Sequence, residues 1–431
     1  MRLIFTILLT IFYTKGVLMS AELTTIKVDG VEVPIVFEHS NIIPTINLQL
    51  TFRDSGSLED GSLAGLAKVS SILLGEGTKK LGATKFAEKL ESKAINLNVG
   101  SGIETFSFDV SALKSEFPSS IKLLRELIND PNLDNEVLSK VKNRQISKLL
   151  SKKSDYDYIA NTELKKLLFD KTPIGRPTTG DIEGIKKIEI KDVKKFLDSH
   201  LNLSRLIVLA GGDISLDELK KMIKPLLKTL PNGKSFHTPF FEASAKEKIE
   251  EKDRDTQQAY IYFGSPFDMK PDNKEYYKAK VAAFILGSSG FGSRMMEEIR
   301  VKRGLAYSAY MRFIVHKSHS YAFGYLQTKV ESQEEAVEVV KEVVSGFVKD
   351  GVTQKELDDA KKFILGSEPL RNETLSQRLS RAFDEYYKGL PLGYHKDELE
   401  LIKNLELKDI NEFIKNHSEI EKLSFSIVTK K

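Results

Sequence analysis

Histidine and cysteine often carry catalytic or metal chemistry, and this chain offers little of either. It has seven histidines and no cysteine, which excludes disulfides, thiolate zinc sites and thiol nucleophiles. The only close histidine pair is His316 and His319, in FIVHKSHSYAFG, and no third ligand stands near it in the sequence. No serine lies in a G-x-S-x-G motif. We therefore interpret the pair as exposed hairpin polarity and predict no metal site in this chain.

A second pattern, SRMMEEIRVKRGLAYS, contains Arg300 and Tyr307, whose side chains could act on a peptide. A phenol can donate a hydrogen bond to an oxyanion, and a guanidinium can hold a peptide carbonyl. By spacing alone, a structural explanation is better than a functional one: Arg300 would be a solvated residue at a helix end, and Tyr307 a packed aromatic residue in a strand. The preceding stretch, GSSGFGS, has a local explanation as a tight turn before a helix with Ser293 near its N-cap. It is not a phosphate-binding loop, because no G-K-[ST] follows.

An internal repeat organises the elements that must position these residues. Residues 185–197 (IKKIEIKDVKKFL) match residues 402–414 (IKNLELKDINEFI), and an apolar run follows each copy. Alternation predicts strands in NLQLTF and TFSFDV, and a 3.6-residue period predicts a helix through Val337, Val340 and Val344. The sequence therefore predicts an α+β fold, with two homologous sandwich domains in tandem. Each is an antiparallel-rich sheet with helices on one face.

The predicted boundaries are a signal peptide over residues 1–21, an N-terminal domain over 22–230, a linker over 231–255 and a C-terminal domain over 256–431. The apolar run at residues 3–13 follows one arginine and is too short to span a bilayer comfortably. We expect a periplasmic or otherwise exported protein without a stable membrane span in the mature chain. The chain is cytoplasmic if Met19 is the true start.

Charge adds little to this picture. The 65 basic and 61 acidic residues leave a net charge of +4, and lysines mix with acids along most predicted helices. Such a balance is typical of solvated helix faces and does not imply a nucleic-acid partner.

The stretch GLAKVSSILLGEGT, residues 65–78, has the frame of a metal-binding helix without its ligands. Together with RDSGSLEDGSLAGLA and the two α+β repeats, it resembles the pitrilysin/insulinase family of zinc peptidases, which includes the mitochondrial processing peptidases. In that family the helix after Gly-Leu-Ala carries H-x-x-E-H, whose histidines bind zinc and whose glutamate takes a proton from the zinc-bound water. Aligned without gaps, the corresponding residues are Lys68, Ser71 and Ile72.

The resemblance also locates the family's third zinc ligand, which belongs to an acidic pair on a later helix. The matching helix is SKVKNRQISKLL, where Val141 and Lys148 stand at the two acidic positions. A lysine ammonium has no lone pair for zinc and repels the cation. A zinc site of the family type is therefore absent.

The second half of the chain retains a motif of the family, whereas the first half lacks the zinc-binding motif. The stretch FILGSSGFGSRMMEEIRVKRGLAYSAY matches the family's C-terminal signature. The resemblance implies that Arg300 and Tyr307 contact the scissile peptide. It also implies that a glycine-rich loop handles substrate, and the loop residues are Gly287, Ser288, Ser289, Gly290 and Gly292.

The resemblance implies a division of labour between two subunits. This chain looks like the non-zinc-binding subunit of a heterodimeric endopeptidase, inactive alone, which closes like a clamshell around a peptide or unfolded protein. Zinc would belong to a homologous partner that carries H-x-x-E-H, and this chain itself would hold no cofactor. Two alternatives stay open: a catalytically silent structural subunit of an envelope complex, and a peptide-binding homodimer or chaperone. Retention of Arg300 and Tyr307 favours the heterodimer over the structural subunit.

Overall fold

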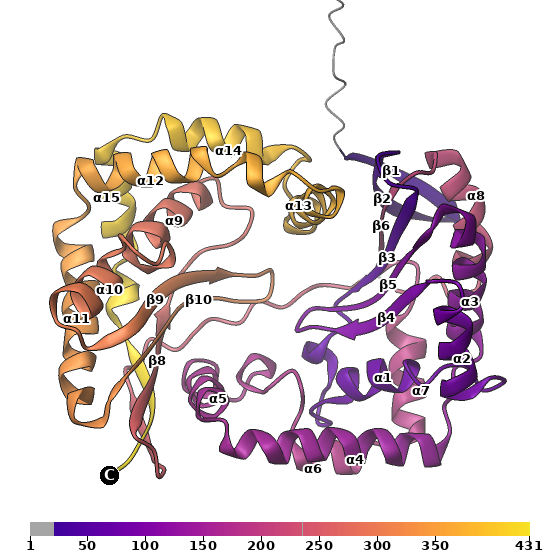
Figure 1. The fold of residues 1–431 in the computed structure, drawn as a ribbon, viewed down its shortest axis with the longest axis horizontal. Coiled ribbons are helices and arrows are strands. Elements are labelled where there is room, and N and C mark those ends of the chain that lie inside the picture. The colour runs from indigo at the N-terminus through magenta and orange to yellow at the C-terminus, as the bar shows by residue number, and fades with distance from the viewer. Residues whose placement is uncertain (1–20, 235) are drawn as a thin grey trace, which may run out of the picture.

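The computed structural model describes residues 21–234 and 236–431. The predicted signal peptide therefore lies outside the described residues, except for Ala21. The chain forms two halves, each built on one sheet with helices packed on its outer face (Figure 1). The predicted α+β fold is confirmed.

The N-terminal half contains a six-stranded sheet in the order β1-β2-β6-β3-β5-β4. Only the β2–β6 pair is parallel. Its strands are β1 (Glu22–Val28), β2 (Val31–His39), β3 (Thr45–Arg53), β4 (Asn96–Ser101), β5 (Thr105–Leu113) and β6 (Leu206–Gly212). Its helices are α1 (Leu66–Leu74), α2 (Gly82–Glu91), α3 (Phe117–Asn129), α4 (Asn135–Ser151), α5 (Tyr156–Leu168), α6 (Ile182–Lys187), α7 (Ile190–His200) and α8 (Leu216–Leu227).

The C-terminal half contains a five-stranded sheet in the order β7-β11-β8-β10-β9, again with one parallel pair, β7–β11. Its strands are β7 (Ile249–Asp253), β8 (Gln258–Pro266), β9 (Ala306–Val315), β10 (Ser320–Lys329) and β11 (Ser424–Thr429). Its helices are α9 (Tyr276–Ala283), α10 (Arg294–Met296), α11 (Gln333–Asp350), α12 (Gln354–Gly366), α13 (Leu375–Lys388), α14 (Tyr394–Lys403) and α15 (Leu407–Asn416). Two π-helical turns, Phe284–Ser288 and Glu297–Lys302, follow α9 and α10.

The sequence repeat coincides with equivalent elements of the two halves. Its first copy covers the end of α6 and most of α7, and its second covers the end of α14 and most of α15. Each copy leads into the strand that forms the parallel pair of its sheet, β6 or β11. Strand β7 lies inside the segment predicted as a linker, so the second sheet begins at Ile249.

Each half sends one helix onto the inner face of the other half's sheet (Figure 1). Helix α5 packs on β8 and β11 of the C-terminal half, and α13 packs on β2 and β6 of the N-terminal half. A glycine in each sheet makes room for the incoming leucine. A Cβ at Gly264 would lie 3.0 Å from Leu168 Cδ1, and one at Gly211 would lie 2.8 Å from Leu379 Cδ1. The predicted pattern of one covered face per sheet did not include this exchange.

Polar contacts close the seam between the halves. Arg378 of α13 donates to the buried Glu38 carboxylate of β2 at 2.8 Å. Glu104 accepts hydrogen bonds from the Ser318 amide at 2.7 Å and from the Tyr387 hydroxyl at 2.8 Å. Since Glu104 belongs to the N-terminal half and both donors to the C-terminal half, the two sheets are held as one unit.

Candidate functional site

Helix α1 carries the three positions that would hold the catalytic motif of a zinc peptidase. Ser71 is buried and its hydroxyl donates to the Lys68 carbonyl at 2.9 Å, which leaves it engaged within the helix. Ile72 packs against the hydrophobic core of the N-terminal half. Lys68 is half-buried and supplies an ammonium group in place of an imidazole. The three side chains are thus one hydroxyl, one alkyl group and one cation.

The helix that would supply the third zinc ligand also lacks a side chain that could bind the metal. Val141 of α4 is fully buried in the core, and Lys148 is exposed. Among residues 21–234 and 236–431, no cluster of three or more His, Cys, Asp or Glu side chains could hold a metal ion. The residues present therefore do not fit the zinc of the peptidase family.

The start of α1 nevertheless keeps a precise geometry. The Asp60 carboxylate accepts from the amides of Gly65 and Ala67, each at 2.7 Å, and so satisfies N–H groups that the helix itself leaves without partners. Burial raises the pKa of Asp60 to about 6, although these two hydrogen bonds favour the charged form. This capping role was not predicted from the sequence.

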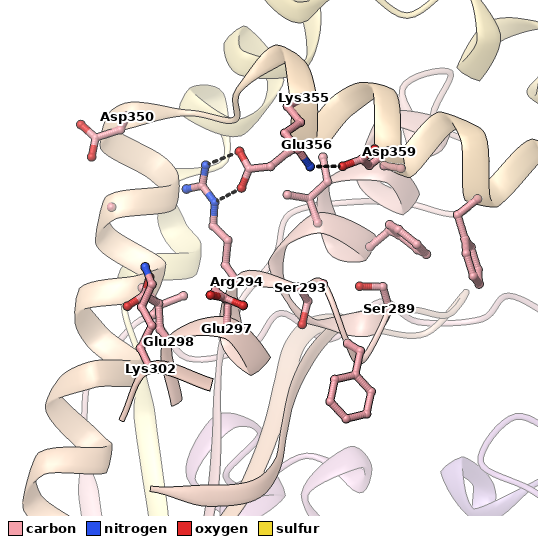
Figure 2. Close-up of a pocket in the computed structure, with 18 of the residues that line it drawn as sticks. Ser289, Ser293, Arg294, Glu297, Glu298, Lys302, Asp350, Lys355, Glu356 and Asp359 are labelled. Carbon is pink, nitrogen blue, oxygen red and sulfur yellow. Dashed lines mark hydrogen bonds and ion pairs between the residues drawn. The ribbon is translucent and has the colours of Figure 1, made fainter. Parts of the chain in front are cut away.

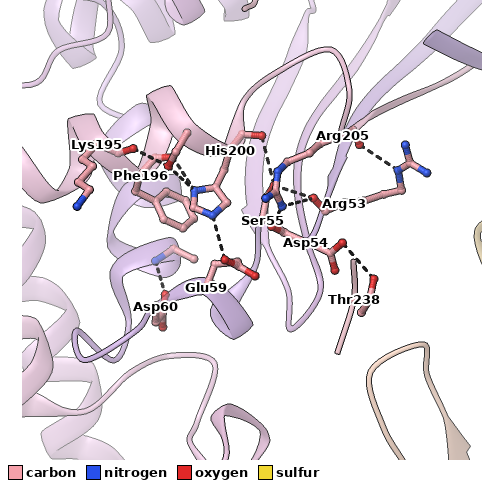
Figure 3. A network of polar contacts seen from close by, with 12 residues as sticks. Arg53, Asp54, Ser55, Glu59, Asp60, Lys195, Phe196, His200, Arg205 and Thr238 are labelled. Atoms are coloured by element: carbon pink, nitrogen blue, oxygen red, sulfur yellow. Dashed lines mark hydrogen bonds and ion pairs between the residues drawn. The ribbon is translucent and has the colours of Figure 1, made fainter. Parts of the chain in front are cut away.

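A polar network near Asp60 lies where the end of β3 meets the start of β6 (Figure 3). The guanidinium of Arg205 donates to the carbonyls of Arg53 and Asp54. Thr238, which follows the N-terminal half, donates to the Asp54 carboxylate at 3.0 Å. Burial raises the pKa of Asp54. These contacts hold the end of β3 and the segment after α8, so the network is structural, although the buried Oδ1 of Asp54 has no hydrogen-bond partner among the described residues.

In the C-terminal half, Arg300 and Tyr307 lie together. Arg300 belongs to the π-helical turn Glu297–Lys302, and Tyr307 lies at the start of β9. The Arg300 guanidinium carbon lies 4.2 Å from the centre of the Tyr307 ring. Its other neighbour is Phe291, at 4.6 Å. Tyr307 is 81% exposed and Phe291 is 70% exposed, so the stack faces solvent and contributes little to the core.

The glycine-rich loop connects α9 to α10 and carries Phe291. A Cβ at Gly287 would lie 2.3 Å from the Met311 amide nitrogen, so this glycine permits close packing of the loop on β9. Gly290 and Gly292 have φ of 72° and 89°, a region that favours glycine. Ser293 caps α10, because its hydroxyl accepts from the Met296 amide at 3.4 Å. Ser288 is exposed and Ser289 is half-buried.

Behind the loop lies a pocket of about 760 Å³ between α10, α11 and α12 (Figure 2). Arg294 crosses it and donates to both carboxylate oxygens of Glu356, at 2.7 and 2.9 Å. Burial alone would raise the pKa of Glu356, but hydrogen bonds from Arg294 and Thr353 lower it to about 2. Arg294 therefore has a structural partner. Within the described part of the chain, no hydrogen bond or ion pair engages the Arg300 guanidinium.

The histidine pair occupies the hairpin between β9 and β10, and only His316 is exposed as predicted. His319 is 1% exposed and its ring lies 5.5 Å from Phe169, a residue of the N-terminal half. Burial lowers the pKa of His319 to about 3, and neighbouring His316 adds to the effect. The sequence prediction missed this burial, because it depends on the exchange of α5 between the halves.

Two family models match the chain in succession. Residues 35–182 match the insulinase model of peptidase family M16, and residues 187–364 match the model of the peptidase M16 inactive domain. A Helicobacter pylori protein described as the non-peptidase homolog YmxG is 43% identical over 430 residues, covering 100% of this chain and 99% of that protein. The chain therefore belongs to the peptidase M16 family, and it is a homologue of the inactive, non-peptidase type.

Solved structures show the same fold. A peptidase M16 inactive domain from Pseudomonas fluorescens superposes with a TM-score of 0.87 at 23% identity, covering 95% of this chain and 98% of that one. A protease from Helicobacter pylori superposes with a TM-score of 0.81 at 17% identity, covering 95% and 100%. Among the described residues, no helix combines the length and the apolar character needed to cross a bilayer.

Proposed function

We propose that this chain is the non-zinc-binding subunit of a heterodimeric endopeptidase that cleaves peptides or unfolded proteins. The observation that carries the proposal is the solvent-facing Arg300 and Tyr307 pair, in a chain whose helix α1 lacks the ligands for zinc. A partner with H-x-x-E-H would supply the metal that activates water and the glutamate that accepts a proton. Arg300 would hold a peptide carbonyl, and the Tyr307 hydroxyl would donate to the oxyanion that forms when water attacks.

Two similar proteins from one organism support the choice of partner. One organism, Helicobacter pylori, contains both a 43% identical non-peptidase homologue and a protease of this same fold. A homologous pair could close around a peptide with this chain's exposed stack facing the partner's zinc helix. A strand edge, such as that of β4, could pair with an extended substrate by β-augmentation.

Co-expression with the H-x-x-E-H homologue of the same genome tests the proposal. We expect a heterodimer that contains one zinc ion and cleaves fluorescein-labelled casein peptides, whereas this chain alone contains no stoichiometric zinc and cleaves nothing. Metal analysis and size-exclusion chromatography report the two properties independently. If the partner alone cleaves at the rate of the complex, this chain is a silent structural or peptide-binding subunit.

We also propose that the protein works outside the cytoplasmic membrane, because the run at residues 3–13 follows the pattern of a signal peptide. The mature chain would then begin near Glu22, where β1 starts. N-terminal mapping of the native protein checks this. An intact Met1, or a start at Met19, would contradict it.

A further inference from the structure

Phe291 is a large apolar side chain that adds little to the core. It lies between Gly290 and Gly292, both in left-handed conformations, and 70% of its surface is exposed. A Cβ at either glycine would meet nothing within 4 Å, so their conformation rather than crowding requires glycine. The loop thus turns sharply at both sides of one exposed ring. Because most of the ring is exposed, its role depends on what it contacts at the surface rather than on the core.

The role follows from what the ring contacts. The Phe291 and Tyr307 rings lie 4.6 and 4.2 Å from the Arg300 guanidinium carbon. Stacking on aromatic rings occupies the faces of a guanidinium and leaves its N–H edge able to donate. Because an arginine side chain loses rotamer entropy when it is ordered, a guanidinium that is already held binds its acceptor at lower cost.

We propose that Phe291 is a positioning residue, which holds the Arg300 guanidinium in place for the substrate and so couples the glycine-rich loop to peptide binding. The inference deepens the proposed function and rests on it. It also assigns the loop a specific task. The loop's glycines allow the turn, and its phenylalanine acts through Arg300.

Phe363 provides a matched comparison on the same face of the C-terminal half. It is 55% exposed on α12 and its ring lies 5.0 Å from that of Phe284. Both phenylalanines line the pocket of Figure 2, but Phe363 packs against another apolar ring, that of Phe284. A general effect of removing an exposed aromatic side chain should therefore appear in Phe363→Ala as well as in Phe291→Ala.

The first experiment tests the stack without any partner. The chain has no tryptophan, so Phe291→Trp introduces a single indole beside Arg300. We expect its fluorescence anisotropy to fall when Arg300→Ala is added, because the ring loses its neighbour. The same addition should leave Phe363→Trp unchanged. If Arg300→Ala does not alter the anisotropy of Phe291→Trp, the stack does not exist in solution and the inference is wrong, whatever the fate of the proposed function.

The second experiment tests the consequence in the reconstituted heterodimer with labelled casein peptides. A cation–π contact at an exposed or partly desolvated site corresponds to about a 2- to 30-fold change in binding. We expect Phe291→Ala to raise KM within that range, with a smaller change in kcat. Phe291→Tyr keeps an aromatic ring and should keep a KM near that of the wild type. Phe363→Ala should change neither constant. If Phe291→Ala keeps the wild-type KM while Arg300→Ala is defective, the positioning role fails and the proposed function stands. If neither variant changes cleavage by an active heterodimer, both fail.

Discussion

Helix α1 and the Phe291–Arg300–Tyr307 stack occupy the two halves of a repeated fold, and they have opposite relations to the core. At α1, the positions that could have held ligands have joined the structure, since Ser71 bonds within the helix and Ile72 packs on the core. The stack keeps two exposed aromatic rings around a cation with no ionic partner among the described residues. Where a functional constraint is absent, side chains settle into packing, and where polar and aromatic groups remain exposed together, a ligand is the simpler explanation.

Tyr307→Phe in the heterodimer tests the functional role of the stack and should have the largest effect. The change keeps the ring that stacks on Arg300 but removes the hydroxyl that would donate to the oxyanion. Loss of one such donor lowers kcat by about 100- to 1000-fold. Steady-state cleavage of casein peptides measures the effect, and size exclusion shows whether assembly is intact. Wild-type turnover in an intact complex would make Tyr307 a stacking residue only.

Arg300→Ala should have a smaller and different effect. A guanidinium that holds a peptide carbonyl acts in the ground state as well as in the transition state, so KM should rise and kcat should fall. A charged hydrogen bond corresponds to about a 10- to 150-fold loss in kcat/KM. Arg294→Ala is not a suitable control, because that residue anchors Glu356. Arg371→Ala, on the exposed segment before α13, should leave both constants unchanged.

Restoring the lost motif tests the other side of the comparison. The triple change Lys68→His, Ser71→Glu and Ile72→His rebuilds H-x-x-E-H on α1 but leaves Val141 and Lys148 in place on α4. We expect no stoichiometric zinc after dialysis, because the third ligand is still missing. We also expect the free energy of unfolding to fall by about 1–3 kcal/mol, since a carboxylate replaces the buried Ser71 hydroxyl. Denaturant titration would measure this as a lower midpoint. Tight one-to-one zinc binding would show that the degenerate site is easily reversible.

The last prediction concerns the pH dependence of the cap of α1. The pKa of Asp60 is raised from 3.8 to about 6 by burial, so the folded state binds a proton more tightly than the unfolded state does. This contribution to stability is present at pH 4 and is lost as the pH rises through 6. The melting temperature of the wild type relative to Asp60→Asn should therefore fall between pH 4 and pH 7. Asp181→Asn, at the exposed cap of α6, removes a comparable cap and controls for the loss of the capping hydrogen bond itself.

Much of this molecule could be predicted from its sequence, for physical reasons that are local. The repeat, the alternation of apolar residues and the signature around Arg300 depend on short segments, and the α+β fold and the M16 family were both predicted from them. The buried residues of α5, Ala160, Leu164 and Leu168, recur at a spacing of four, which is typical of one face of a helix. Periodicity shows that such a face is buried but not which sheet covers it.

The remaining features depend on that tertiary information. The burial of His319 against Phe169 and the position of Phe291 over Arg300 each join residues of different elements, whose proximity no spacing in the sequence indicates. The network around Arg205 is similar, since it connects residues 53, 54 and 205 across neighbouring strands. These are contacts between elements, and they become visible only when the elements are placed.

The exchange of helices between the halves has a consequence for biosynthesis. The inner face of the first sheet buries Val36 and Leu209 against Leu379 of α13, which the ribosome makes much later than β6. At 5–20 residues per second, roughly ten to thirty seconds separate the two elements. For that interval the nascent N-terminal half leaves the apolar patch at Val36 and Leu209 uncovered, and this patch is buried only after most of the chain has been translated.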